Sequence, residues 1–325
     1  MLRRVIPLLP WAALVGAAAA VAVVNDGYVT TVATVTILWA ILAVGLNVIM
    51  GYAGYLHLGL GAFYGLGAYG AAILAVRYHQ AAWVPMILMP LLGAAVGAVL
   101  GPIVLRTRGL HFAVATMAIG MIVSDVSNNW VSVTGGPIGI AGIARPGKFM
   151  IGPALVNLKT PIGFFALGCL LLLLLLVVGS VMHRSRFVLV LRGLKSDEML
   201  TRSFGFPTVR YKVAAFAVAG AYAAIAGVLY AYFIQYISPE PFTFFSASFQ
   251  AFVVLAIGGP GLLWGPVLGA ALLTGLPEIL QLDPQVKLIV YGLVLLAVIV
   301  LLPRGLAAGL TDAFSYVATR FRRAV

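Results

Sequence analysis

The stretch PIGFFALGCLLLLLLLVVGSVM, residues 161–182, carries no charged side chain from one end to the other. A helix needs about 20 apolar residues to cross the roughly 30 Å hydrocarbon core of a bilayer. A continuous apolar run predicts such a helix and excludes a membrane β-barrel, whose strands alternate apolar and polar positions. Cys169, the single cysteine, lies inside this run and is expected to serve packing only.

The rest of the chain has the same character, with 63% hydrophobic and 9% charged residues among 325. Soluble domains are only about 45–50% apolar. We therefore expect an all-α polytopic membrane protein with about ten transmembrane helices (8 to 10), some broken by Gly and Pro, forming a single transmembrane domain over residues 1–325. Hydropathy and Pro/Gly punctuation place the spans at about 8–24, 31–50, 57–76, 83–105, 110–131, 161–182, 212–234, 244–258, 262–281 and 286–303.

Two of these spans need comment. Residues 1–24 resemble a secretory signal peptide, but the first helix of a polytopic protein looks the same, and we favour an uncleaved helix. The span at 244–258 is short and ends in the Gly258–Gly261 break, so it is expected to be part of a broken or re-entrant helix.

The basic residues predict the orientation. With ten spans and both termini in the cytoplasm, only five of the 20 Lys and Arg residues lie outside: Arg77, Arg145, Lys148, Lys159 and Lys287. This bias follows the positive-inside rule. It also explains the net charge of +12. The expected partner of this charge is anionic membrane lipid, and no nucleic acid is expected. The tail 304–325 is then a basic cytoplasmic tail.

The segment 184–212, RSRFVLVLRGLKSDEMLTRSFGFPTVRYK, is the most highly charged internal loop and is predicted to be cytoplasmic. Residues 196–204 predict a short helix, with Ser196 as its N-cap, Asp197 and Glu198 in its first turn, and Gly205 as its end. The alternative is a solvated basic loop held at the lipid surface.

Motifs for chemistry are missing from the sequence. There is no phosphate-binding loop GxxxxGK[ST], no HExxH and no pair of cysteines. We therefore expect no catalytic residues, no metal site and no cofactor in this chain.

Asp125 is expected to lie within the fifth span, where an isolated carboxylate costs several kcal/mol unless it is paired, hydrated or neutralised. With Asn128 and Asn129 it forms a polar stripe at helical spacing. The stripe either lines a translocation pathway or joins helices through hydrogen bonds. Asp125 is also the one candidate coupling group if the protein is an ion-driven secondary transporter.

The glycine-rich stretch around residues 45–61 interrupts the second and third spans. Broken helices of this kind commonly build substrate sites and gates. We therefore also expect the pathway to include Asn47, Gly51, Gly54 and Tyr55.

Three long blocks carry a family resemblance: GLNVIMGYAGYLHLGLGAFYGLGAYGAAIL (45–74), RGLHFAVATMAIGMIVSDVSNNWVSVTGGPIGIAGI (108–143) and ISPEPFTFFSASFQAFVVLAIGGPGLLWGPVLGAALL (237–273). Together they resemble the LivM-type membrane permeases of branched-chain amino-acid ABC transporters. The resemblance implies a multi-pass subunit of the bacterial inner membrane with no ATPase site of its own. Its implied partners are a second permease subunit, two ATP-binding subunits that carry ATP and Mg, and a periplasmic substrate-binding protein.

The resemblance also implies roles for two loops. The short helix of the cytoplasmic loop would be the ATPase-coupling element, with a degenerate motif formed by Asp197, Glu198, Met199, Leu200 and Gly205. The periplasmic loop 132–160 would receive the binding protein, with Arg145, Lys148 and Lys159 as candidate docking residues.

This chain departs from the family pattern at several positions of the pathway blocks: Tyr55, His57, Leu60, Met121, Ser124 and Asp125. Relatives of this type are associated with branched-chain and other amino acids, urea, amides and aromatic acids. The resemblance therefore implies import of branched-chain or related amino acids, with urea, amides or aromatic acids as alternatives.

Overall fold

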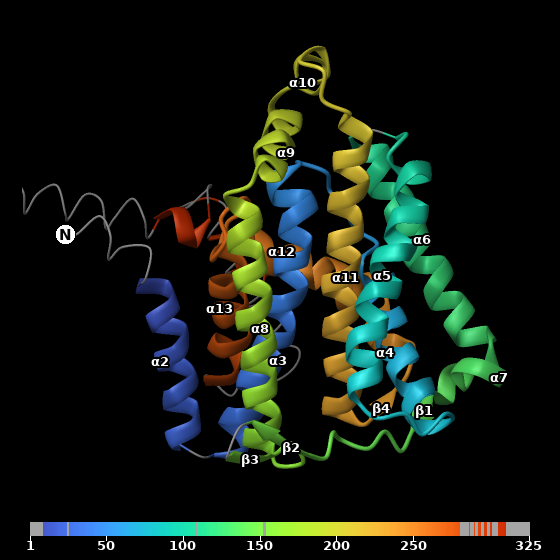
Figure 1. Cartoon of the computed structure of the whole chain (residues 1–325), viewed down its shortest axis with the longest axis vertical. Helices are drawn as coiled ribbons and strands as arrows, with labels where there is room; N and C mark the ends of the chain where they lie inside the picture. Colours follow the sequence, from blue (N-terminus) through green and yellow to red (C-terminus); the bar gives the residue numbers. More distant parts are fainter. Residues whose placement is uncertain are drawn as a thin grey trace, which may run out of the picture.

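The computed structural model describes residues 9–24, 26–107, 109–151, 154–279 and 305–309, with single positions between 286 and 300. The chain forms a bundle of helices (Figure 1). The longer helices are α2 (Leu9–Val24), α3 (Gly27–Leu46), α4 (Leu60–Val76), α5 (Trp83–Val104), α6 (Leu110–Asn129), α8 (Pro161–His183), α9 (Arg186–Ser196), α11 (Thr208–Ile234), α12 (Gln250–Gly258) and α13 (Gly265–Ile279). Short elements are α7 (Val131–Thr134), α10 (Glu198–Ser203), β1 (Ile140–Ala141), β2 (Lys148–Ile151), β3 (Ala154–Asn157) and β4 (Tyr236–Ile237).

The bundle has two distinct ends (Figure 1). The strand end carries the loops 132–160 and 235–243, which are joined where β1 pairs antiparallel with β4. The basic end carries α9 and α10. The loops at the strand end and the segment with α9 and α10 lie at opposite ends of the bundle, as the predicted alternation of spans requires. Which end faces the cytoplasm stays a prediction.

The described helices agree with the membrane class. Five of them are long and apolar enough to cross a membrane: Gly27–Tyr52, Trp83–Val104, Leu110–Asn129, Pro161–His183 and Thr208–Ile234. Four further predicted spans coincide with shorter apolar helices. Most of the predicted span 286–303 and of the basic tail lies outside the described residues.

The glycine-rich stretch is broken in the way its composition suggests. α3 continues into a π-helix, η1 (Asn47–Tyr52), and the chain then runs without helical structure until α4 begins at Leu60. The third span therefore starts later than the predicted residue 57. Gly54 has a φ of +78°, a conformation that glycine adopts without a steric cost.

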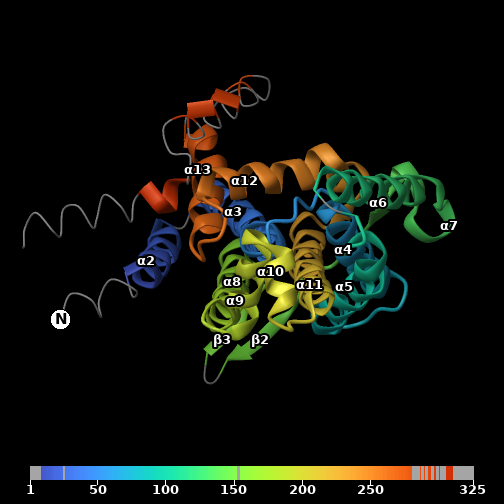
Figure 2. The same ribbon diagram turned by 90° about the horizontal axis from the view of Figure 1, so that it is seen from above.

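A second irregular segment folds into the bundle from the strand end. It comprises the turn η3 (Glu240–Phe242), the π-helix η4 (Phe244–Phe249) and α12. Phe242 is buried, and the Ser248 hydroxyl accepts a hydrogen bond from the Gly61 amide of α4. α12 then runs obliquely across the bundle (Figure 2). Such irregular backbone is tolerated at membrane depth only where protein covers it, which is the arrangement here.

Helix α11 holds the centre through close contacts at glycines. Along α5, Gly93, Gly97 and Gly101 all face α11. A Cβ atom added at Gly97 would lie 2.8 Å from the Ala217 Cα, so the two backbones are as close as they can be. Small residues allow this approach where lipid gives helices no hydrophobic reason to associate.

We predict that Gly97→Leu lowers the folding stability by at least about 2 kcal/mol, because the added side chain must separate α5 from α11. Gly16→Leu is the matched control, since nothing lies within 4 Å of a Cβ at that position of α2. Thermal unfolding of the detergent-solubilised protein measures the stability of both variants. Equal midpoints would show that α5 and α11 do not depend on this contact.

Candidate functional site

The short helix α10 stands apart from the bundle at the basic end (Figure 1). It spans Glu198–Ser203 and is separated from α9 by the extended residue Asp197. The Asp197 carboxylate accepts a 2.9 Å hydrogen bond from the Leu200 amide and is therefore the N-cap. At the other end, Gly205 has a φ of +84° and terminates the turn, as predicted.

The predicted cap was wrong by one residue. Ser196 is the last residue of α9, and Asp197 caps α10 and does not lie in its first turn. Both residue types cap helices well. The choice between them depends on where α9 ends, which is set by the packing of its buried residues Val188, Leu191 and Leu194.

The outer surface of α10 is apolar. Met199 is 79% exposed and Leu200 is 55% exposed, while Phe204 just beyond the helix is 72% exposed. A contiguous exposed apolar patch of this kind typically marks an interaction surface. We call Met199, Leu200 and Phe204 the α10 apolar face.

Glu198 points the other way, into the protein. One carboxylate oxygen forms an ion pair with the Lys212 ammonium of α11, and the other accepts a 3.1 Å hydrogen bond from the Tyr55 hydroxyl. The Lys212 nitrogen also lies 5.0 Å from the centre of the Tyr55 ring. Because the Lys212 side chain is only 3% exposed, its charge depends on this carboxylate. Glu198 therefore anchors α10 to the bundle.

A second anchor joins α9 to the glycine-rich stretch. The Lys195 ammonium donates a 3.0 Å hydrogen bond to the Gly51 carbonyl, and its side chain packs against Gly54. Gly51, Gly54 and Tyr55 were predicted to line a pathway. In the structure they form the contact between the broken end of α3 and the helices α9 and α10.

Asn47 has a different neighbourhood. Its amide is 2% exposed, donates to the Leu262 carbonyl and accepts from the Gly261 amide, both at 2.8 Å. It thus fixes the Gly258–Gly261 break against η1. Both the nitrogen and the oxygen of this side chain thus join the two broken segments.

The polar stripe of α6 lies away from these residues. Asp125 and Asn129 are exposed, Asn128 is half-buried, and the Asn129 amide donates to the Asp125 carbonyl oxygen. Asp125 thus faces outward from this chain, about one turn before the end of α6.

The predicted docking residues at the strand end separate as well. Lys159 is exposed and Lys148 begins β2, but the guanidinium of Arg145 turns inward. It donates to the Phe233 carbonyl oxygen at the end of α11 (3.2 Å) and lies 5.7 Å from the centre of the Phe164 ring.

Sequence reasoning missed Lys195 and Lys212 as site residues. Lys212 carried a signal, because it lies in the second turn of a helix that is uncharged beyond it and follows the only two acids of the segment, Asp197 and Glu198. Among the described residues, no three His, Cys, Asp or Glu side chains come together in a way that would hold a metal ion.

The fold and its two ends define a multi-pass membrane protein, and comparison with known proteins identifies the family. The chain belongs to the permease-component family of branched-chain amino acid transport systems, whose model matches residues 28–299. This chain is therefore a membrane permease component.

Individual relatives agree. The chain is 34% identical over 293 residues to the high-affinity branched-chain amino acid transport system permease protein LivM of Salmonella typhimurium, covering 85% of this chain and 69% of the relative. The Escherichia coli K12 LivM gives the same figures. The ribose import permease protein RbsC of E. coli K12 is 27% identical over 242 residues, covering 72% of this chain and 71% of the relative. No solved structure matches.

We predict that Glu198→Gln loosens α10, because it leaves the buried Lys212 charge without its carboxylate. The loss of stability should be up to about 3 kcal/mol, which is the lower end of the range for breaking a fully buried ion pair. Hydrogen exchange of the amides of residues 198–205 should accelerate. The double variant Glu198→Gln, Lys212→Met should recover much of the protection.

Asp197→Asn is the control for this cycle, since asparagine caps helices as well as aspartate does. It should leave the exchange rates nearly unchanged. If Glu198→Gln behaves like Asp197→Asn, the pair with Lys212 does not anchor α10.

Proposed function

We propose that this chain is the permease subunit of an ABC importer for branched-chain or related amino acids in a bacterial inner membrane. With a second permease subunit it forms the translocation pathway. A periplasmic binding protein delivers the substrate, and two partner subunits hydrolyse ATP with Mg. The family match supports the transporter class, and the names of the LivM relatives support the substrate class.

The observation that carries the coupling role is the two-sided construction of α10. Its apolar face is exposed to a partner, while Glu198 is tied to Lys212 and Tyr55 on the inner side. A helix exposed on one side and anchored on the other can pass a displacement to α11 and to residues 51–55. A solvated loop at the lipid surface, the alternative interpretation of the sequence, has no need of a buried ion pair.

The position of Asp125 bears on the pathway. Because Asp125 and Asn129 face outward from this chain, they belong to the pathway only if it runs between the two permease subunits. The alternative of an ion-coupled secondary transporter gains no support from this geometry, since an exposed carboxylate near a helix end is not a buried coupling site.

We predict that the double variant Met199→Ser, Leu200→Ser abolishes most co-purification of the ATP-binding subunits, because the α10 apolar face then loses the area it would bury. Ile138→Ser is the control, an equally exposed apolar residue (81%) at the strand end. A variant complex that still assembles and transports would contradict docking through α10.

We further predict that Asp125→Asn reduces ATP-driven amino-acid uptake while the protein is produced at its normal level. The amide keeps the size of the side chain but removes its charge. Unchanged uptake in proteoliposomes would place Asp125 outside the pathway and leave it a surface residue of α6.

A further inference from the structure

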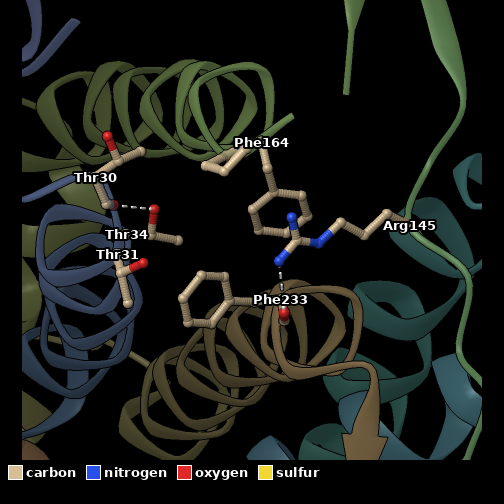
Figure 3. Close-up of a pocket in the computed structure, with 7 residues that line it drawn as sticks. Thr30, Thr31, Thr34, Arg145, Phe164 and Phe233 are labelled. Carbon is tan, nitrogen blue, oxygen red and sulfur yellow. Dashed lines mark hydrogen bonds between the residues drawn. The ribbon is translucent and has the colours of Figure 1, made fainter. Parts of the chain in front are cut away.

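A small cavity lies at the strand end, between the first turns of α3, the start of α8 and the end of α11 (Figure 3). Its volume is about 40 Å³, and it is partly open to the surface. Its walls are formed by Thr30, Thr31, Thr34, Arg145, Pro161, Phe164 and Phe233. No role has been given so far to these threonines.

One wall of the cavity offers only hydrogen-bond donors. The Arg145 guanidinium has five N–H groups and no acceptor. One terminal nitrogen donates to the Lys159 carbonyl oxygen (3.3 Å) and the other to the Phe233 carbonyl oxygen (3.2 Å). The Nε atom is buried and has no partner in the described part of the chain. Arg145 therefore keeps unused donors after its structural bonds are made.

The opposite wall offers acceptors. The hydroxyl of Thr30 donates to the Asp26 carbonyl oxygen (2.7 Å), that of Thr31 to Gly27 (2.8 Å) and that of Thr34 to Thr30 (2.7 Å). Each hydroxyl proton is thus committed to the backbone of α3. The Thr30 hydroxyl points away from Arg145, so what α3 still has to offer a ligand is the lone pairs of the Thr31 and Thr34 oxygens (Figure 3). Figure 3 shows the threonines and Arg145 on opposite sides of the cavity.

The remaining walls are apolar. The rings of Phe164 and Phe233 are stacked, with their centres 5.9 Å apart and an interplanar angle of 27°. They lie beside the guanidinium, so that a ligand held by Arg145 would place its apolar part against them. α8 also begins at this cavity, and the partial positive charge of a helix N-terminus favours an anionic group there.

We propose that this cavity binds the head group of a zwitterionic α-amino acid, with the carboxylate on Arg145, the ammonium on the threonine oxygens and the side chain against Phe164 and Phe233. The inference rests on the proposed function and narrows it. An amide or urea offers Arg145 only a neutral carbonyl oxygen, and an aromatic acid offers the threonine oxygens no ammonium, so each loses a charge-assisted hydrogen bond at one wall.

The volume sets how the ligand lies. A cavity of about 40 Å³ has room for roughly three water-sized groups, because each needs about 10–15 Å³. These three groups are the ammonium and the two carboxylate oxygens, and the carbon atoms that join them lie toward the open side. The side chain of a branched-chain amino acid lies across the open side of the cavity, where its length is not restricted.

Binding to the assembled permease and ATPase complex, without the binding protein, tests the site. Saturation-transfer NMR compares L-leucine, leucinamide, which lacks the carboxylate, and 4-methylpentanoate, which lacks the ammonium. We expect leucine to bind at least about tenfold more tightly than either analogue, as charge-assisted hydrogen bonds require.

Variants assign each wall. Arg145→Gln should remove the preference for leucine over leucinamide, and Arg145→Lys should restore part of it. Thr34→Val, which keeps the shape of the side chain, should remove the preference for leucine over 4-methylpentanoate. Arg77→Gln is the control, because it removes the same charge at an exposed position that does not line the cavity. It should bind all three probes as the unmodified complex does.

Equal binding of the three probes, or equal effects of Arg145→Gln and Arg77→Gln, would overturn the site. Uptake by the complete transporter with its binding protein separates this failure from that of the proposed function. Normal leucine uptake without leucine binding at this cavity overturns the site alone. An active complex that takes up no amino acid overturns both.

Discussion

The ion pair between Glu198 and Lys212 is the interaction on which the basic end of this permease depends. Burying the charge of a lysine that is only 3% exposed is costly unless a carboxylate lies beside it, and Glu198 supplies one from a helix of six residues. Such a short helix has too few internal hydrogen bonds to persist alone. The pair, together with the Tyr55 hydroxyl, fixes α10 in place and thereby turns Met199 and Leu200 outward.

The same pair connects parts of the chain that are far apart in sequence. α10 is tied to α11 through Lys212 and to the broken end of α3 through Tyr55, while Lys195 holds Gly51. Asn47 carries the connection on to Leu262 beside the second break. A displacement of α10 would thus reach both irregular segments of the bundle. At the strand end, by contrast, the chain is joined by Arg145 and by the pairing of β1 with β4.

Local signals in the sequence were sufficient for part of this account. Continuous apolar runs placed the helices, and an acidic residue followed by a glycine placed α10, because capping and chain reversal depend on neighbouring residues. The direction of the Glu198 side chain could not be predicted from neighbouring residues, since Lys212 comes close to it only when α11 packs into the bundle. The contacts of Asn47 and Arg145 were not predictable for the same reason: their partners Leu262 and Phe233 are distant in sequence. The exposure of Asp125 likewise depends on which face of α6 the bundle covers.

Photo-crosslinking in the assembled transporter tests the central claim most directly. A benzophenone-bearing residue in place of Met199 should crosslink to an ATP-binding subunit, whereas the same residue in place of Ile138 at the strand end should not. This result would establish α10 as the surface through which ATP hydrolysis on another chain moves this one. Crosslinking of position 199 to lipid alone, in a complex that hydrolyses ATP and transports, would contradict the account.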